Sequence, residues 1–230
     1  AEEYGGPIFE VGCGSGRVML HLAQEGYDVH GIDNEASMLE RGRRRVSGFP
    51  HLRERLTFLH GDVLTYDLKG SYKLTLLSYN SLMHFHEQET QIALLKRLRA
   101  LTDAEGLLAI DLPNAGEAFA TQDSDAIALE RTFIEPETGH LVMQQAYSTL
   151  DRVEQLMHVT WVYDEITGDG VVQRTLAPII MRYYFYSELC LLLAAAGFKV
   201  EEVYGDPDHG PFEDGCPRMI VLAKPLAISD

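Results

Sequence analysis

The stretch Ile8-Phe9-Glu10-Val11-Gly12-Cys13-Gly14-Ser15-Gly16-Arg17-Val18 decides the fold of this chain. An apolar run ending in an acid and followed by three alternating glycines is typical of a buried strand, a tight turn and the start of a helix. Because glycine has no Cβ atom, the N–H groups of the turn can approach a ligand, and the positive end of the helix points to the same place. The stretch therefore predicts a site for a small polar or anionic molecule.

Strands and helices alternate along the next hundred residues. We expect helices at 16–25, 35–46 and 87–101, and strands at 27–33, 56–60, 74–79 and 107–112. This order predicts a parallel sheet with right-handed crossovers. Near the end of the chain, apolar spacing predicts a helix up to Gly197 with Ser187 as its N-cap. Two final strands are expected at 199–204 and 218–223.

The segment 115–183 has a different pattern. Residues 115–128 predict a loop, with one helical turn as an option, and apparent strands follow at 131–135, 141–150, 153–164 and 171–182. Within 153–164, apolar residues from Val153 to Tyr163 alternate with polar residues. This alternation predicts an antiparallel meander with one covered face.

Composition excludes several classes of function. The 230 residues, 46% of them hydrophobic, suffice for one core with a modest elaboration. A net charge of −16 argues against a nucleic-acid or anionic-membrane partner, because phosphate binding needs clustered Lys and Arg. The basic run at 41–45 is interpreted as a solvated helix face, with a local phosphate contact as the alternative.

Three cysteines, Cys13, Cys190 and Cys216, lie far apart and without Cys-x-x-Cys spacing. This spacing predicts neither a zinc site nor a disulfide framework, and it favours a reducing, cytoplasmic setting. The longest apolar run, 189–198, is too short to span a bilayer. The sequence begins without methionine directly before the first strand, which leaves an upstream segment open.

Glycine spacing distinguishes between two kinds of nucleotide site. A dinucleotide fold would place its third glycine at position 17, which is Arg17. The pattern Glu-x-Gly-x-Gly-x-Gly instead resembles motif I of the class I S-adenosylmethionine-dependent methyltransferases. The order of strands and acids over about 7–112 and 187–224 is similar to that family too. The resemblance implies an α/β fold, with a Rossmann-like seven-stranded, mostly parallel sheet from 1–114 and 184–230. Residues 115–183 would then be an antiparallel insertion within the same domain.

Several residues suit parts of S-adenosylmethionine. The Asp33 carboxylate ends the second strand, where it can accept hydrogen bonds from both ribose hydroxyls. In the family, an acid at Asp62 commonly accepts from the adenine amino group, and Glu10 suits the ammonium. Taken singly, these positions are equally well explained as turn or core residues. The resemblance implies as cofactor-binding residues Glu10, Gly12, Cys13, Gly14, Gly16, Asp33, Asn34, Met38, Gly61, Asp62, Val63, Tyr79 and Asn80.

The loop after the fourth strand is expected at the ligand-binding edge of the sheet. His84 is the well-placed titratable group there, and we predict that it orients or deprotonates a methyl acceptor. A helix-capping or loop role explains His84 equally well, and His86 is expected to be capping or exposed. Ser78-Tyr79-Asn80-Ser81 departs from the Asn-Pro-Pro-Tyr type sequence of base-amine methylases, which argues against DNA or RNA as substrate.

The insertion resembles the wall over the acceptor in small-molecule N-methyltransferases, including glycine and amino-sugar types. Candidate substrate residues are Trp161, Arg182, Tyr184 and His209, with core packing or a dimer seam as the alternative for most of them. The overall hypothesis is transfer of a methyl group from S-adenosylmethionine to a small polar molecule, preferably an amine, without a metal. The alternatives are a non-catalytic S-adenosylmethionine-binding module and an NAD-dependent oxidoreductase. A homodimer is left open.

Overall fold

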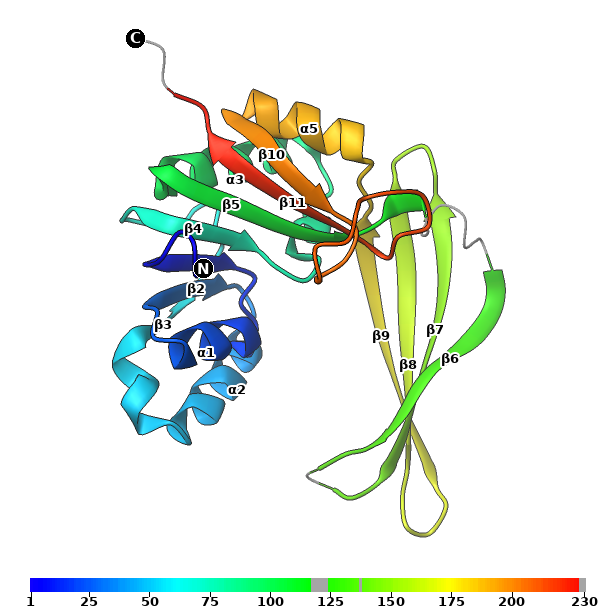
Figure 1. Ribbon diagram of the computed structural model, residues 1–230. Helices are drawn as coiled ribbons and strands as arrows, with labels where there is room; N and C mark the ends of the chain where they lie inside the picture. The colour runs from blue at the N-terminus through cyan, green and yellow to red at the C-terminus, as the bar shows by residue number, and fades with distance from the viewer. Residues whose placement is uncertain (117–123, 137, 228–230) are drawn as a thin grey trace. The chain divides into compact units, whose positions relative to one another are not determined.

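The computed structural model describes residues 1–116, 124–136 and 138–227 (Figure 1). The chain divides into two compact units. The first consists of residues 1–114 and 184–230, and the second of residues 115–183.

A seven-stranded sheet forms the centre of the first unit. Its strands are β1 (Ile8–Val11), β2 (Val29–Asp33), β3 (Leu56–His60), β4 (Tyr72–Leu77), β5 (Thr102–Pro113), β10 (Phe198–Tyr204) and β11 (Arg218–Pro225). They lie in the order β10-β11-β5-β4-β1-β2-β3, with β1 to β5 parallel and β11 antiparallel to both of its neighbours. This arrangement confirms the α/β, mostly parallel fold that the sequence predicts.

Within the described residues, four helices and two short 3₁₀ turns connect these strands. They are α1 (Arg17–Gln24), α2 (Ala36–Ser47), α3 (Gln88–Leu101), α5 (Tyr186–Ala195), η1 (Pro50–Arg55) and η2 (Ser81–His84). The expectation that Ser187 caps α5 is wrong. The N-cap lies two residues earlier, at Phe185, because the Phe185 carbonyl already accepts a hydrogen bond from the Leu189 amide at 3.0 Å. Among the described residues, no helix is both long enough and apolar enough to cross a bilayer.

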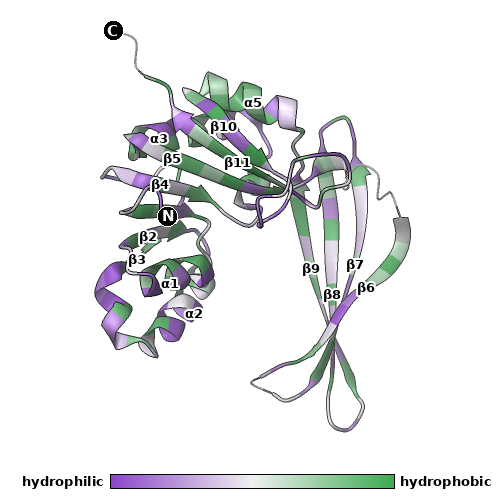
Figure 2. Cartoon of the chain, viewed as in Figure 1, coloured by the Kyte–Doolittle hydropathy of each residue, from purple (hydrophilic) through white to green (hydrophobic). Residues whose placement is uncertain are grey.

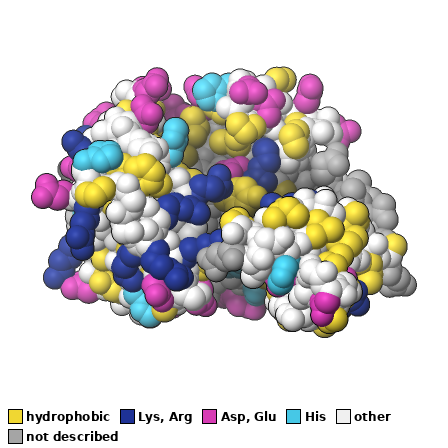
Figure 3. Space-filling model, turned by 90° about the horizontal axis from the view of Figure 1, so that it is seen from below, with side chains coloured by type: hydrophobic (Ala, Val, Ile, Leu, Met, Phe, Trp, Pro, Cys, Tyr) yellow, Lys and Arg dark blue, Asp and Glu magenta, His cyan; other side chains and the backbone are white. Residues whose placement is uncertain are grey.

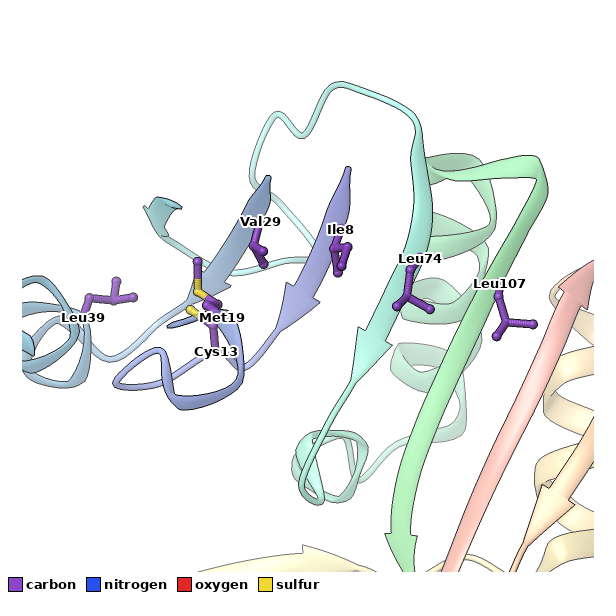
Figure 4. Packing of buried hydrophobic residues seen from close by; sticks show 7 residues of the cluster. All are labelled: Ile8, Cys13, Met19, Val29, Leu39, Leu74 and Leu107. Atoms are coloured by element: carbon purple, nitrogen blue, oxygen red, sulfur yellow. The ribbon is translucent and has the colours of Figure 1, made fainter. Parts of the chain in front are cut away.

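A row of apolar side chains crosses the middle of the sheet (Figure 4). Leu107, Leu74, Ile8 and Val29 come from the four adjacent strands β5, β4, β1 and β2, and each is paired in register with the next. All four are buried. In Figure 2, the strands of this sheet are largely hydrophobic, whereas α2 carries many hydrophilic residues. The buried row fixes the register of the strands whose ends carry the candidate site.

The second unit is a four-stranded antiparallel sheet. Its strands are β6 (Ser124–Ile134), β7 (Leu141–Asp151), β8 (Leu156–Ile166) and β9 (Val172–Arg182), in that order. Residues 117–123 of the predicted loop lie outside the described residues. The expectation that the loop continues to residue 128 is wrong, because Ala128 of β6 pairs with Ala146 of β7. The start of the third strand at Val153 is also wrong. The amide of Val153 donates to Asp151 Oδ1 at 3.0 Å in a turn that precedes β8.

Burial in β8 does not follow one face. Val159 is buried on one side of the strand, whereas Val162 and Asp164 are buried on the other. Asp164 is accommodated because Arg174 donates two hydrogen bonds of 2.7 Å to its carboxylate oxygens. The prediction of a single covered face is therefore wrong for this strand.

Candidate functional site

Close packing explains why glycines occupy the loop after β1. Gly12, Gly14 and Gly16 have φ values of +69°, +52° and +69°, which L side chains rarely adopt. A Cβ atom on Gly12 would lie 2.6 Å from Ser81 Oγ, and one on Gly16 would lie 2.7 Å from the Phe58 ring. The loop is therefore pressed against both η2 and β3.

The amides of this loop are largely used within the protein. Gly12 and Cys13 donate to the Ile32 carbonyl at 2.9 and 3.2 Å, and Gly14 donates to Asp33 Oδ2 at 2.7 Å. The expectation that these N–H groups face a ligand is therefore wrong.

Backbone amides also orient the two acidic side chains at the sheet edge. Asp33 Oδ2 accepts from Gly14 and Asp33 Oδ1 accepts from the Glu35 amide at 2.8 Å, which fixes the carboxylate plane. Asp62 Oδ1 accepts from the Leu64 amide at 2.8 Å. Since each carboxylate oxygen has two lone pairs, Asp33 retains acceptor capacity for a vicinal diol.

Glu10, the last residue but one of β1, is 2% exposed. The Ser78 hydroxyl donates to its Oε1, whereas Oε2 is buried without a hydrogen-bond partner among the described residues. Burial raises the pKa of Glu10 to about 7, against the opposing effects of the Ser78 hydrogen bond and the Arg17 charge. A buried acceptor without a partner is costly, and a positively charged ligand group would satisfy it. Glu10 does not line the cavity described below, so its contact with the cationic end of S-adenosylmethionine stays a prediction.

One cavity of about 410 Å³ lies in the first unit, at the carboxyl ends of β1, β2 and β3. Of the residues predicted for the site, it is lined by Gly12, Asp33, Asn34, Gly61, Asp62, Val63 and His84. Residues that the sequence reasoning missed also line it, namely Val11, Ile32, Leu64, Ser81, Phe85 and Thr90, together with Glu87 and His86, the latter expected only to be capping or exposed. The structure thus joins strand ends that are distant in sequence with the segment between β4 and α3.

Other predicted cofactor residues lie beside this cavity's loops without lining it. Met38 Cε would lie 3.4 Å from a Cβ atom on Gly14, so Met38 packs against the glycine turn. Cys13 is buried, and burial raises the pKa of its thiol well above the usual range. A thiol held neutral in this way is no nucleophile, so a contribution from Cys13 would come from its backbone. Tyr79 is largely exposed.

His84 ends η2 on the cavity wall. Desolvation by the surrounding protein lowers its pKa, as does the neighbouring His86, while Asp33 acts in the opposite direction. A lowered pKa keeps the imidazole neutral near pH 7, which is the form that can accept a proton.

Two buried side chains hold the segment that carries His84. Gln91 Nε2 donates to the carbonyls of Phe85 and His86 at 2.8 and 3.0 Å. The Tyr184 hydroxyl donates to the carbonyls of Leu82 and Phe85 at 3.1 and 2.9 Å. Tyr184 is 2% exposed and does not line the cavity, so its observed contacts are with the backbone that carries the histidines.

The other predicted substrate residues also lie outside the cavity lining. Trp161 is half-buried in β8, and the Arg182 guanidinium donates to the Glu154 carbonyl at 3.2 Å within the second unit. His209 has a positive φ of +64° in the loop after β10, and its ring lies 4.6 Å from the ring of Tyr204. Their contact with an acceptor stays a prediction.

Basic side chains gather on the face of the molecule shown in Figure 3. On α2, Arg41, Arg43, Arg44 and Arg45 are exposed, as expected for a solvated helix face. A second cavity of about 440 Å³ is lined by Arg43 and Arg53 with Val46, Ser47, Pro50, Leu56 and Phe58. In the part of the chain that the structure describes, no three His, Cys, Asp or Glu side chains cluster as metal ligands.

Comparisons with known proteins agree on one kind of domain. Residues 8–106 match the family described as a methyltransferase domain. A protein named as a methyltransferase in Bacillus subtilis, YqeM, is 25% identical over 137 residues, which cover 56% of this chain and 54% of the relative. This chain spans about half the length of the curated relatives it matches.

Two solved structures share the fold over nearly the whole chain. The CcbJ methyltransferase from Streptomyces caelestis has a TM-score of 0.81 and 23% identity, covering 96% of this chain and 84% of CcbJ. CalS10 from Micromonospora echinaspora, an amino pentose methyltransferase solved with S-adenosylmethionine bound, has a TM-score of 0.70 and 17% identity. That match covers 94% of this chain and 81% of CalS10.

Proposed function

We propose that this protein transfers the methyl group of S-adenosylmethionine to a small polar molecule, preferably an amine, because residues 8–106 match a methyltransferase-domain family and the fold is shared with methyltransferases such as CcbJ and CalS10. The donor supplies a methyl group on a sulfonium, which a lone pair of the acceptor displaces in line. The protein's contribution to such a reaction is chiefly alignment in a pocket that limits water.

The observation that carries this proposal is the composition of the cavity. Its walls combine carboxylates suited to the donor, Asp33 and Asp62, with His84 and Glu87 from the segment after β4. A module that only bound the donor would have no need of the second pair, His84 and Glu87. The additional side chains therefore support a site for an acceptor next to the donor.

The charge of Glu87 and the neutral imidazole of His84 favour an amine as the methyl acceptor. The Glu87 carboxylate attracts an ammonium, and a neutral His84 can remove the proton that blocks the nitrogen lone pair. The described amino-pentose specificity of CalS10 is consistent with an acceptor of this class. His84 is thus proposed as the base or orienting group, and Asp33 and Glu10 as groups that hold the donor.

Two other functions give different results in binding experiments. A non-catalytic module binds S-adenosylmethionine and transfers nothing, and an oxidoreductase binds NADH. Calorimetry with the wild-type protein should show binding of S-adenosylmethionine and none of NADH. An Asp33→Ala variant should lose most donor binding, whereas Asp28→Ala, which removes an exposed ion pair with Arg55 at 3.0 Å, should keep it.

Turnover with methyl-labelled S-adenosylmethionine then tests catalysis on a pool of amino sugars, amino acids and small amines. We expect labelled product from the wild-type protein and a loss of about 10²- to 10⁴-fold in His84→Ala. His51→Ala serves as the matched control because His51 is exposed on η1 and does not line the cavity. Equal turnover of the two histidine variants would refute the role of His84, and donor binding without any labelled product would favour the non-catalytic module.

A further inference from the structure

Two consecutive residues after β4 have an unusual backbone conformation. Tyr79 has a φ of +48° and Asn80 a φ of +71°, both in the left-handed region. This region is uncommon for residues other than glycine, and for a bulky residue such as Tyr79 it is strained. Such a conformation persists only where neighbouring groups determine it.

The Arg17 guanidinium of α1 lies 4.8 Å from the centroid of the Tyr79 ring, and the groups that bond to the backbone of this turn come from β5 and β11. Tyr79 donates its amide to Asp111 Oδ2 at 3.3 Å, and Asn80 donates its amide to the Asp111 carbonyl at 3.0 Å. Arg218 Nη2 then bridges Asp111 Oδ1 at 2.6 Å and Asn80 Oδ1 at 2.9 Å, and Arg218 Nε donates to the same Asp111 oxygen at 2.9 Å. Asp111 thus accepts hydrogen bonds from both residues, and Arg218 donates to Asp111 and to Asn80.

The turn that they hold also contacts the donor loop. Ser78 donates its hydroxyl to Glu10, and Ser81 donates its hydroxyl to the Ser78 carbonyl at 2.7 Å. Ser81 Oγ lies where a Cβ atom on Gly12 would collide with it. Displacement of residues 78–81 would therefore move the partner of Glu10 and one wall of the cavity together.

We infer that the Arg218–Asp111 pair is a positioning device for the donor site, which sets the turn at Tyr79 and Asn80 so that Ser78 and Ser81 meet Glu10 and Gly12. The inference rests on the proposed function, since it concerns the affinity for S-adenosylmethionine. Neither Arg218 nor Asp111 lines the cavity, so both act through the turn.

The test compares Arg218→Met with Arg99→Met. Arg99 is a suitable control because it too donates to backbone carbonyls in the first unit, to Gly197 at 3.1 Å and Leu226 at 2.7 Å, away from the turn. We expect both variants to lose thermal stability, whereas only Arg218→Met should bind S-adenosylmethionine about tenfold more weakly, which corresponds to about 1.4 kcal/mol. Equal affinities in the two variants would overturn the inference.

A second substitution distinguishes positioning from general damage. Glycine adopts positive φ without strain, so Asn80→Gly in the Arg218→Met background should restore most of the lost affinity. In the protein without ligand, amide exchange at residues 79 and 80 should be faster in Arg218→Met than in Arg99→Met. Failure of the rescue, or unchanged exchange, would contradict the inference. If wild-type protein itself did not bind S-adenosylmethionine, the proposed function would fail instead, and unchanged exchange would still overturn the positioning role.

Discussion

The Ser78 hydroxyl donates a hydrogen bond to Oε1 of Glu10, while Oε2 of the same carboxylate is buried without a partner among the described residues. This half-satisfied acid joins β1, which leads into the glycine loop, with the turn after β4. Its raised pKa makes both ligand affinity and stability depend on pH near neutrality.

The affinity for S-adenosylmethionine should rise with pH. With a pKa of about 7, Glu10 is mostly protonated at pH 6 and mostly ionised at pH 8, and the ionised form attracts the cationic ligand. Since apparent affinity scales with the competent fraction, we expect about a tenfold gain between these pH values. Titration calorimetry of wild type and Glu10→Gln checks this, because the variant should lack that gain. An identical pH dependence in both proteins would exclude Glu10 as its source.

The stability of the ligand-free protein should change in the opposite direction. A carboxyl whose pKa rises from 4.5 to about 7 on folding binds its proton more tightly in the native state, so stability is lost as pH rises through that interval. We expect a loss of about 2–3 kcal/mol in the free energy of unfolding between pH 5 and pH 8 from this group. Urea denaturation should show a smaller loss in Glu10→Gln, and parallel curves for the two proteins would contradict the expectation.

Two glycine substitutions distinguish the cost of a steric clash with Phe58 from the cost of placing alanine at a positive φ. Gly16→Ala meets both a positive φ and the Phe58 ring, whereas Gly26→Ala has a φ of +99° and no atom within 4 Å of its new Cβ. We expect Gly16→Ala to cost about 2–4 kcal/mol and Gly26→Ala about 1 kcal/mol. Thermal or urea denaturation measures both, and equal costs would show that Phe58 does not confine the loop.

The pH profile of turnover should reflect a neutral His84. Because desolvation lowers the pKa of His84 below the usual histidine value of 6.5, the imidazole is mostly neutral at pH 6.5 and takes up its proton at lower pH. The acidic limb of kcat/KM attributable to this group should therefore lie below pH 6.5. An acidic limb at or above pH 6.5 that disappears in His84→Ala would contradict a lowered pKa for His84.

The alternation of strands and helices along the chain was predictable because local patterns indicate it, and the resemblance to a known family then implied the seven-stranded sheet. The Glu10 to Gly16 stretch, and carboxylates at strand ends such as Asp33 and Asp62, have spacings that few other structures require. Hydrophobic periodicity did not predict the structure of the segments that are determined by long-range contacts. β6 is extended by pairing with β7, and Asp164 is buried by Arg174, neither of which a local pattern can show.

The site was predictable only in part, for a similar reason. Strand-end acids and glycines carry a sequence signal, but Glu87 and Thr90 join the cavity through the path of the chain between β4 and α3. The prediction that the loop amides face a ligand is wrong because their partners, the Ile32 carbonyl and the Asp33 carboxylate, lie on β2, and local sequence does not show this contact. No spacing rule connects Arg218 with Asn80, which meet only because β11 pairs with β5.

The most direct test of the central claim is mass spectrometry of products formed from S-adenosylmethionine with a deuterated methyl group. With a pool of small amines, the wild-type protein should yield one labelled methylamine product for each S-adenosylhomocysteine formed, and Asp33→Ala should yield almost none. Donor binding by the wild-type protein without labelled product from any amine or hydroxyl acceptor would contradict the assignment of this cavity to methyl transfer.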